Sequence, residues 1–197
     1  MIRRLSWALL FATLGAGVVG AARQRREIVH PGGATRPPAT PPPTPGPVGR
    51  ALAGWVPPPP RTATGRAAAL VWASPLTAVG LLVAFVSGGR PRWHPEYGCF
   101  VTEGVRGPSA LALRLVGAEA NAIGHVVLSR HGTNAAALLA HEAVHVRQAE
   151  RLGPLLFPLY LWLSARYGYR HHPIEQAARL GARRAVEAAG PTGRRPV

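Results

Sequence analysis

Uncharged apolar runs and Pro-rich segments divide the first half of the chain. Two arginines near the N-terminus precede an uncharged, mostly apolar run, which predicts a signal peptide or an uncleaved signal anchor over residues 1–22. The next segment, residues 23–66, is rich in proline and contains the run Pro57-Pro58-Pro59-Pro60. Such a segment favours extended polyproline conformation and buries little apolar surface, so we expect a disordered spacer.

A second uncharged run covers residues 67–86. As a helix it would rise about 30 Å, which matches the hydrocarbon thickness of a bilayer. The run stops at Ser87-Gly88-Gly89, and Arg90 and Arg92 follow at once. A buried core helix has a similar composition, but the length and the abrupt polar end favour a transmembrane helix within residues 67–89.

Residues 90–197 have shorter apolar patterns, which predict an α+β domain. Three β-prone runs separated by Gly, Pro or Asn predict a small antiparallel β-meander. A helical pattern then ends at a Gly-Pro pair, and a last helix starts at a proline. The apolar stretch between these helices is too short to cross a membrane, and it is either a core helix or an interfacial segment. We expect the strands at 97–102, 110–116 and 122–128, the helices at 135–152 and 173–189, and the apolar stretch at 155–163.

Composition limits the classes of partner. The formal net charge is +15, all 23 basic residues are arginine, and all 8 acidic residues are glutamate. The arginines are dispersed in ones and twos without interleaved aromatic residues, so the charge favours anionic lipid over nucleic acid as a partner. Cys99 is the only cysteine, which excludes an intrachain disulfide and a Cys-based zinc site.

The segment His141-Glu142-Ala143-Val144-His145 carries the candidate chemistry. It matches the pattern H-E-x-x-H, in which two histidines one helical turn apart face one metal ion and the glutamate serves as general base. The apolar periodicity places this segment within the predicted helix 135–152, and no proline interrupts it. The sequence therefore predicts a zinc site with His141 and His145 as ligands and Glu142 as the catalytic residue.

A catalytic zinc ion needs a third protein ligand. Because the chain has no aspartate, a carboxylate ligand must be a glutamate. Glu150 points away from the histidine face of the motif helix, and Glu187 lies near the end of the last helix. Glu175 lies in the first turn of that last helix, which can fold back if residues 153–172 form a hairpin. We therefore predict Glu175 as the third ligand.

Ligation by two histidines and one glutamate from two helices resembles the gluzincin class of metallopeptidases. The chain is also similar to a group of small uncharacterised bacterial membrane proteins, in the blocks HEAVHVRQ at residues 141–148 and HPIEQAA at residues 172–178. The resemblance covers about residues 120–180. It implies a zincin-like helical hairpin and a place in the plasma membrane of a bacterium. The chain departs from gluzincins at Arg179, where that class often has an aspartate that orients a ligand histidine.

These features predict a membrane-tethered zinc metallopeptidase that contacts lipid and hydrolyses a peptide or protein substrate. An extended substrate would pair with the strand at 122–128, and His125 or Tyr169 would stabilise the oxyanion. Glu150 is a candidate to replace the missing aspartate. The alternative is a membrane protein whose zinc-like site is inactive or structural and acts in binding or assembly. Arginine flanks both apolar runs, so the topology stays open, with the cytoplasmic side slightly favoured for the metal domain. The oligomeric state also stays open.

Overall fold

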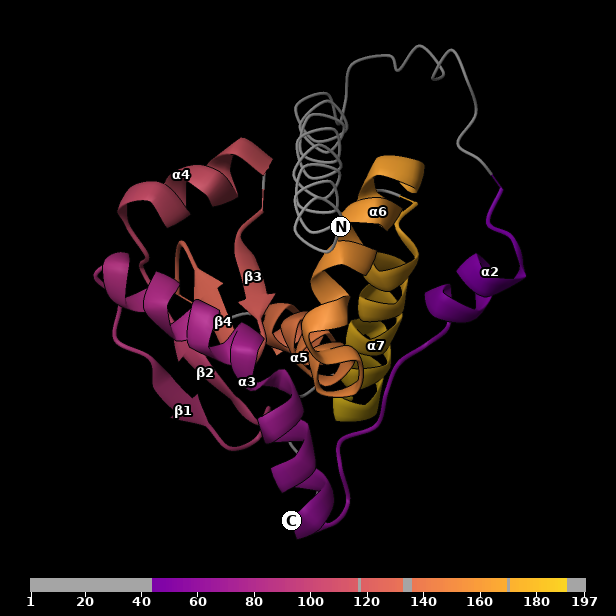
Figure 1. The fold of residues 1–197 in the computed structure, drawn as a ribbon, viewed down its shortest axis with the longest axis horizontal. Coiled ribbons are helices and arrows are strands. Elements are labelled where there is room, and N and C mark those ends of the chain that lie inside the picture. The colour runs from indigo at the N-terminus through magenta and orange to yellow at the C-terminus, as the bar shows by residue number, and fades with distance from the viewer. Residues whose placement is uncertain (1–43, 117, 133–135, 170, 191–197) are drawn as a thin grey trace, which may run out of the picture.

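The computed structural model describes residues 44–116, 118–132, 136–169 and 171–190. The predicted signal segment, residues 1–22, and the spacer residues 23–43 lie outside the described residues. The elements, in chain order, are α2 (Pro47–Ala53), α3 (Ala63–Val86), β1 (Arg92–His94), β2 (Cys99–Thr102), α4 (Gly107–Val116), β3 (Ala120–Ile123), β4 (Val126–Ser129), α5 (Ala136–Leu152), the 3-10 turn η1 (Gly153–Leu155), α6 (Leu156–Tyr167) and α7 (Pro173–Ala189). Figure 1 shows the sheet on one side of the molecule and α7 and α2 on the other, with α5 between them. The fold is α+β, as predicted.

The four strands form a mixed sheet in the order β1-β2-β4-β3. Because β2 and β4 run parallel, the prediction of an antiparallel meander is wrong. The single strand expected at 122–128 is a hairpin of β3 and β4, since Gly124 adopts a φ of +59° between them. A Cβ at Gly124 would lie 2.4 Å from the Thr77 nitrogen, so glycine is required where this turn meets α3.

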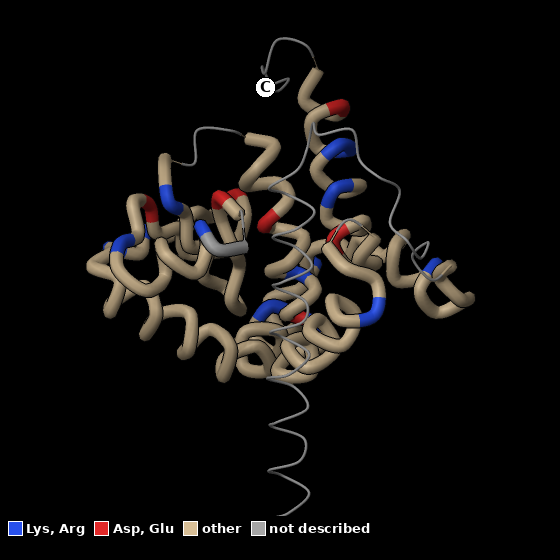
Figure 2. The backbone as a smooth tube through the Cα atoms, turned by 90° about the horizontal axis from the view of Figure 1, so that it is seen from above, with Lys and Arg blue, Asp and Glu red and all other residues tan. Residues whose placement is uncertain are grey.

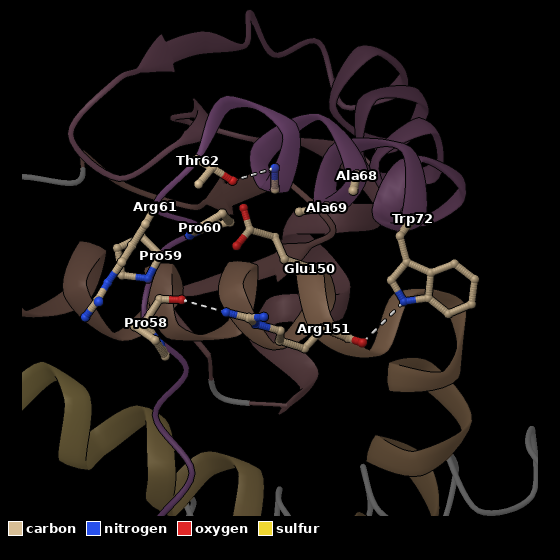
Figure 3. Close-up of a pocket in the computed structure, with 11 residues that line it drawn as sticks. Pro58, Pro59, Pro60, Arg61, Thr62, Ala68, Ala69, Trp72, Glu150 and Arg151 are labelled. Carbon is tan, nitrogen blue, oxygen red and sulfur yellow. Dashed lines mark hydrogen bonds between the residues drawn. The ribbon is translucent and has the colours of Figure 1, made fainter.

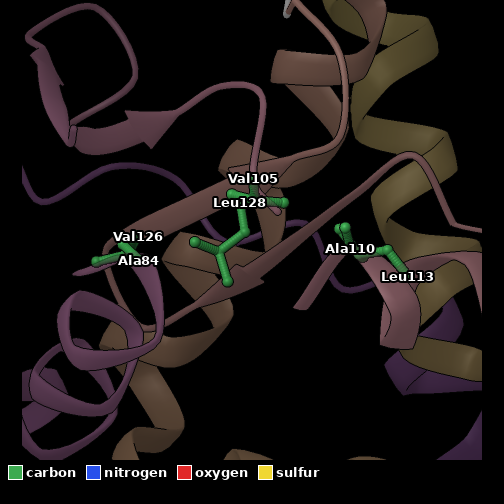
Figure 4. Close-up of a cluster of buried hydrophobic side chains, with 6 residues drawn as sticks. All are labelled: Ala84, Val105, Ala110, Leu113, Val126 and Leu128. Atoms are coloured by element: carbon green, nitrogen blue, oxygen red, sulfur yellow. The ribbon is translucent and has the colours of Figure 1, made fainter. Parts of the chain in front are cut away.

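The segment expected as a strand at 110–116 forms most of helix α4, which corrects that prediction. Its Ala- and Leu-rich composition favours a helix. Ala110 and Leu113 lie three residues apart and are buried in one cluster with Val105 and Leu128 (Figure 4). This spacing follows the helical period rather than the alternation of a strand. The helix lies between β2 and β3 in the chain, where a meander would have a short turn.

Helix α3 begins after Thr62, whose side chain accepts a hydrogen bond from the Gly65 nitrogen. The helix expected over residues 67–86 is confirmed, and by length and composition it could cross a membrane. Small residues face the rest of the molecule: a Cβ at Gly80 would lie 2.6 Å from the Ile123 carbonyl oxygen. Large apolar side chains are exposed on α3, namely Leu70, Val71, Trp72, Val79, Leu82, Phe85 and Val86.

The described part of the predicted spacer, residues 44–66, contains helix α2, an extended segment and the first turn of α3, although most of its residues are exposed. Helix α2 packs against α7. In the extended segment that follows, the Pro57 side chain is fully buried, and Arg151 donates a hydrogen bond to the Pro58 carbonyl oxygen at 3.3 Å. Proline limits the backbone conformations of the unfolded chain. Folding this Pro-rich segment therefore costs less conformational entropy than folding an irregular segment without proline.

Helices α5 and α7 occupy the ranges predicted for them within the described residues, since residue 135 lies outside these. The apolar stretch between them forms the last residue of η1 and much of helix α6. Leu163 is buried, whereas Phe157 and Trp162 are exposed. One face of the segment is therefore core, as in one of the two predictions, and the other exposes apolar side chains; the interfacial role stays a prediction.

Candidate metal centre

Two helices bring the predicted ligands together. His141 and His145 lie one turn apart on α5, and Glu175 lies in the first turn of α7. The Glu175 carboxylate oxygens lie 3.4 Å from His141 Nε2 and 3.2 Å from His145 Nε2, and the two Nε2 atoms are 3.2 Å apart. Helix α7 approaches α5 closely because Gly181 faces Val144, where a Cβ would lie only 2.5 Å from a Val144 methyl carbon.

The spacing of these ligand atoms fits a metal ion. Two ligands at about 2.0–2.1 Å from a tetrahedral zinc ion lie about 3.3 Å from each other. The two histidine Nε2 atoms are 3.2 Å apart, and each lies close to a different Glu175 oxygen, His145 to Oε1 at 3.2 Å and His141 to Oε2 at 3.4 Å. Glu175 Oε2 is buried and has no hydrogen-bond partner among the described residues. A buried carboxylate oxygen is stable only beside a donor or a cation. His141, His145 and Glu175 can therefore hold a metal ion.

Neutral side chains form hydrogen bonds with two of the candidate ligands. His145 Nδ1 lies 2.8 Å from Gln148 Oε1, so the ring donates Nδ1–H to the amide and turns Nε2 toward the site. The Tyr160 hydroxyl donates to Glu175 Oε1 at 2.7 Å. Gln148 is fully buried. It takes the orienting role expected of an aspartate at position 179, where Arg179 instead donates to the Tyr169 carbonyl oxygen.

His172 fixes the first turn of α7, which carries Glu175. Its Nδ1 accepts a hydrogen bond from the Glu175 nitrogen at 3.4 Å, and its Nε2 lies 3.0 Å from the Tyr160 carbonyl oxygen. These partners require a neutral ring with the proton on Nε2. The His172 side chain thus links α6 to α7 next to Glu175.

The charges of the cluster favour a cation. Burial disfavours the charged form of His145, but the Glu175 carboxylate outweighs burial and raises the pKa of His145 to about 9. Burial alone would raise the pKa of Glu175, yet the two histidines hold it well below its ordinary value. Zinc binds the neutral imidazole, so a proton and zinc compete for His145, and zinc affinity is expected to rise with pH up to about 9.

Glu142 lies beside the ligands with one carboxylate oxygen free. The residue is 4% exposed, and its Oε2 has no hydrogen-bond partner among the described residues. The backbone of Ala122 in β3 forms a hydrogen bond to the carboxylate. Burial raises the pKa of Glu142, and His145 and His141 oppose that rise. A carboxylate with a raised pKa is a better proton acceptor at neutral pH.

Two of the three auxiliary candidates lie elsewhere. His125 is buried, with Nδ1 at 2.9 Å from Thr77 Oγ1 and Nε2 at 3.4 Å from Glu150 Oε1. Because both ring nitrogens of His125 are engaged, it has no free donor for an oxyanion, and Glu150 supports His125 rather than a ligand histidine. Tyr169 does lie near the cluster, since burial and the Glu175 carboxylate raise its pKa to about 12.

Gln148, Tyr160 and His172 are the site residues that sequence reasoning missed. Gln148 had a usable signal, because it lies three residues after His145 and so on a neighbouring position of the same helix face. His172 begins the block at residues 172–178, but that resemblance gave it no role, and Tyr160 had no signal, since the contacts of both residues with Glu175 depend on how α6 meets α7.

Comparisons of the chain with protein-family models, with curated proteins and with solved structures give no match. Function is therefore inferred from the geometry of this chain alone.

Proposed function

We propose that this protein is a membrane-tethered zinc metallopeptidase. The observation that carries the proposal is the cluster of His141, His145 and Glu175, whose candidate ligand atoms lie within 4.8 Å of one another, with the unpaired carboxylate oxygen of Glu142 beside it. Three protein ligands leave one coordination position for water or substrate, which is typical of catalytic rather than structural zinc.

Each residue of the site then has a task in hydrolysis. Bound zinc supplies a Lewis acid and lowers the pKa of water toward about 7. Glu142 accepts a proton from the attacking water and returns it to the leaving amine. Tyr169 keeps its proton at neutral pH, because its pKa is about 12, and is the candidate donor to the developing oxyanion. Gln148 and Tyr160 hold His145 and Glu175 in place.

An exposed strand edge supports a peptide as the substrate. β3 is an edge strand of the described sheet, and Asn121 within it is exposed. The next residue, Ala122, contacts the Glu142 carboxylate through its backbone. An extended peptide that added to this edge would have its own backbone beside Glu142. This arrangement favours a peptide bond over a small polar substrate.

The apolar exterior supports membrane attachment. Large apolar side chains are exposed on two helices, such as Leu82 and Phe85 on α3 and Phe157 and Trp162 on α6. Extensive exposed apolar surface is typical of a contact with a partner or a membrane. The basic residues of the described part of the chain are spread over several elements in Figure 2, whereas a nucleic-acid binder typically has its arginines clustered on one face.

The variant Glu142→Gln tests the peptidase proposal. It should retain zinc and lose about 10²-fold or more of the hydrolytic rate, because the general base is gone. Mass spectrometry of a peptide library digested by the detergent-solubilised full chain measures this, with Glu187→Gln, an exposed position on α7, as the control. Undiminished cleavage by Glu142→Gln rules out the mechanism. A zinc-loaded wild-type chain that cleaves nothing favours the structural-site alternative.

A further inference from the structure

A cavity of about 540 Å³ lies where the Pro-rich segment, the first turns of α3 and the end of α5 meet (Figure 3). None of the three metal ligands lines it. Pro58 forms part of one wall, Trp72 lies on another, and Glu150 projects into it. The cavity is therefore a separate site on the same domain.

Glu150 gives the cavity an unsatisfied acceptor. Its Oε1 lies 3.4 Å from His125 Nε2, but its Oε2 is buried without a hydrogen-bond partner among the described residues. The side chain as a whole is 12% exposed. A carboxylate in this position calls for an N–H or O–H donor from a bound molecule.

Two arginines line the same cavity. Figure 3 shows the guanidinium groups of Arg61 and Arg151 beside Pro58 and Pro59, whereas the Glu150 carboxylate points toward the start of α3. Arg151 uses one of its donors on the Pro58 carbonyl oxygen, and Arg61 is exposed. A simple cation would be repelled by the arginines, and a simple anion by Glu150. A zwitterion with an amine and a phosphate satisfies both sets of groups.

The cavity opens next to the apolar exterior of α3. Trp72 lines it, and the exposed residues Leu70 and Val71 lie within one helical turn. Tryptophan and arginine at the end of an apolar helix are typical of the headgroup level of a membrane. We propose that this cavity binds the phosphoethanolamine headgroup of a membrane lipid, with the ammonium on Glu150 and the phosphate on Arg61 and Arg151. This inference rests on the membrane attachment proposed above and is independent of the peptidase activity.

Native mass spectrometry of the detergent-solubilised full chain tests the proposal. The chain is titrated with short-chain phosphatidylethanolamine, phosphatidylcholine, phosphatidylglycerol and free phosphoethanolamine. Phosphatidylethanolamine is expected to bind at least about tenfold more tightly than the other two lipids, because it alone offers charged N–H donors and a phosphate: phosphatidylcholine has no N–H, and phosphatidylglycerol has only neutral O–H donors. Equal binding of the three lipids overturns the proposal. Free phosphoethanolamine that binds as tightly as the lipid overturns the assignment to a membrane lipid.

Variants locate the site. Glu150→Gln is expected to lose the preference for phosphatidylethanolamine by about tenfold. Arg61→Gln, an exposed position that leaves the fold intact, should weaken phosphatidylethanolamine and phosphatidylglycerol together. Glu187→Gln, far along α7, should change neither. An unaltered preference in Glu150→Gln, or unaltered affinities in Arg61→Gln, contradicts the site.

The zinc content of the same samples distinguishes failure of this proposal from failure of the proposed peptidase. Lipid preference without zinc contradicts only the peptidase, and zinc without lipid preference contradicts only this cavity.

Discussion

The hydroxyl of Tyr160 reaches the third ligand from α6, and it orients Glu175 without adding charge. Tyr160→Phe should weaken zinc binding by about 10–100-fold, which is the usual effect of removing a hydrogen bond to a metal ligand. Competition with a chelating dye measures the affinity. Tyr167→Phe on the same helix is the matched control and should bind zinc as the wild type does. If the two variants behave alike, the Tyr160 hydrogen bond has no role in holding the metal.

His172 should make stability depend on pH. Burial lowers its pKa from 6.5 to about 4. As the pH falls, His172 is therefore protonated in the unfolded chain at a higher pH than in the folded protein. The contribution of neutral His172 to the free energy of unfolding is complete above pH 6.5 and is lost as the pH falls toward 4. The full loss is about 3 kcal/mol. Urea unfolding at about pH 5 and pH 7.5 should show a smaller pH effect in His172→Asn, which can still cap α7 but does not titrate. The same pH effect in both proteins would remove His172 as its cause.

The spacing of His141 and His145 identifies two candidate metal ligands from the sequence, because helical geometry alone places residues four apart on one face. The role of Glu142 as general base stays a prediction. Glu175 is found by excluding the other glutamates. Gln148 and Tyr160 are not found in this way, since an amide or a hydroxyl becomes a supporting group only through its position in the folded chain.

At the scale of elements, Gly153 allows α3 to pack against the end of α5. It has a φ of +54°, and a Cβ there would lie 2.6 Å from the Trp72 ring. Gly153→Ala should cost about 1–2 kcal/mol for the backbone and a further 1–3 kcal/mol for the clash. Gly190→Ala is the matched control, since it has a φ of +69° with nothing within 4 Å and meets only the backbone cost. Urea unfolding midpoints measure the stability of both variants. Equal losses of stability would mean that the Trp72 side chain moves aside without cost and that the clash is absent.

The long helices were predictable because an apolar period repeated over many residues overrides local ambiguity. The short elements were not. The apolar run in α4 is too short to distinguish a helix from a strand by its pattern. Burial of Ala110 and Leu113 in the folded protein favours the helix. The parallel pairing of β2 and β4 depends on where α4 leads the chain, and no local pattern encodes that path.

At the scale of the whole molecule, the metal centre and the apolar exterior share one framework. Helix α5 carries His141 and His145, packs on α7 through the Gly181 contact, and touches α3 at Trp72. The HExxH motif led to the residues that can hold a metal ion, and lipid contact stays a prediction from the apolar runs and the arginines. The sequence could not predict that residues 54–62 pack beside α5, because a Pro-rich segment shows no apolar period from which its packing can be read.

The most direct test of the account is the zinc stoichiometry of the purified full chain. Wild type and Glu187→Ala should each bind one zinc ion per chain, and removal of the ion by a chelator should lower the unfolding temperature, because zinc links α5 to α7. Glu175→Ala loses the only ligand from α7 and should bind zinc at least about 100-fold more weakly. A wild-type chain that takes up no zinc, or a Glu175→Ala chain that binds it as tightly as wild type, would contradict the metal centre described above.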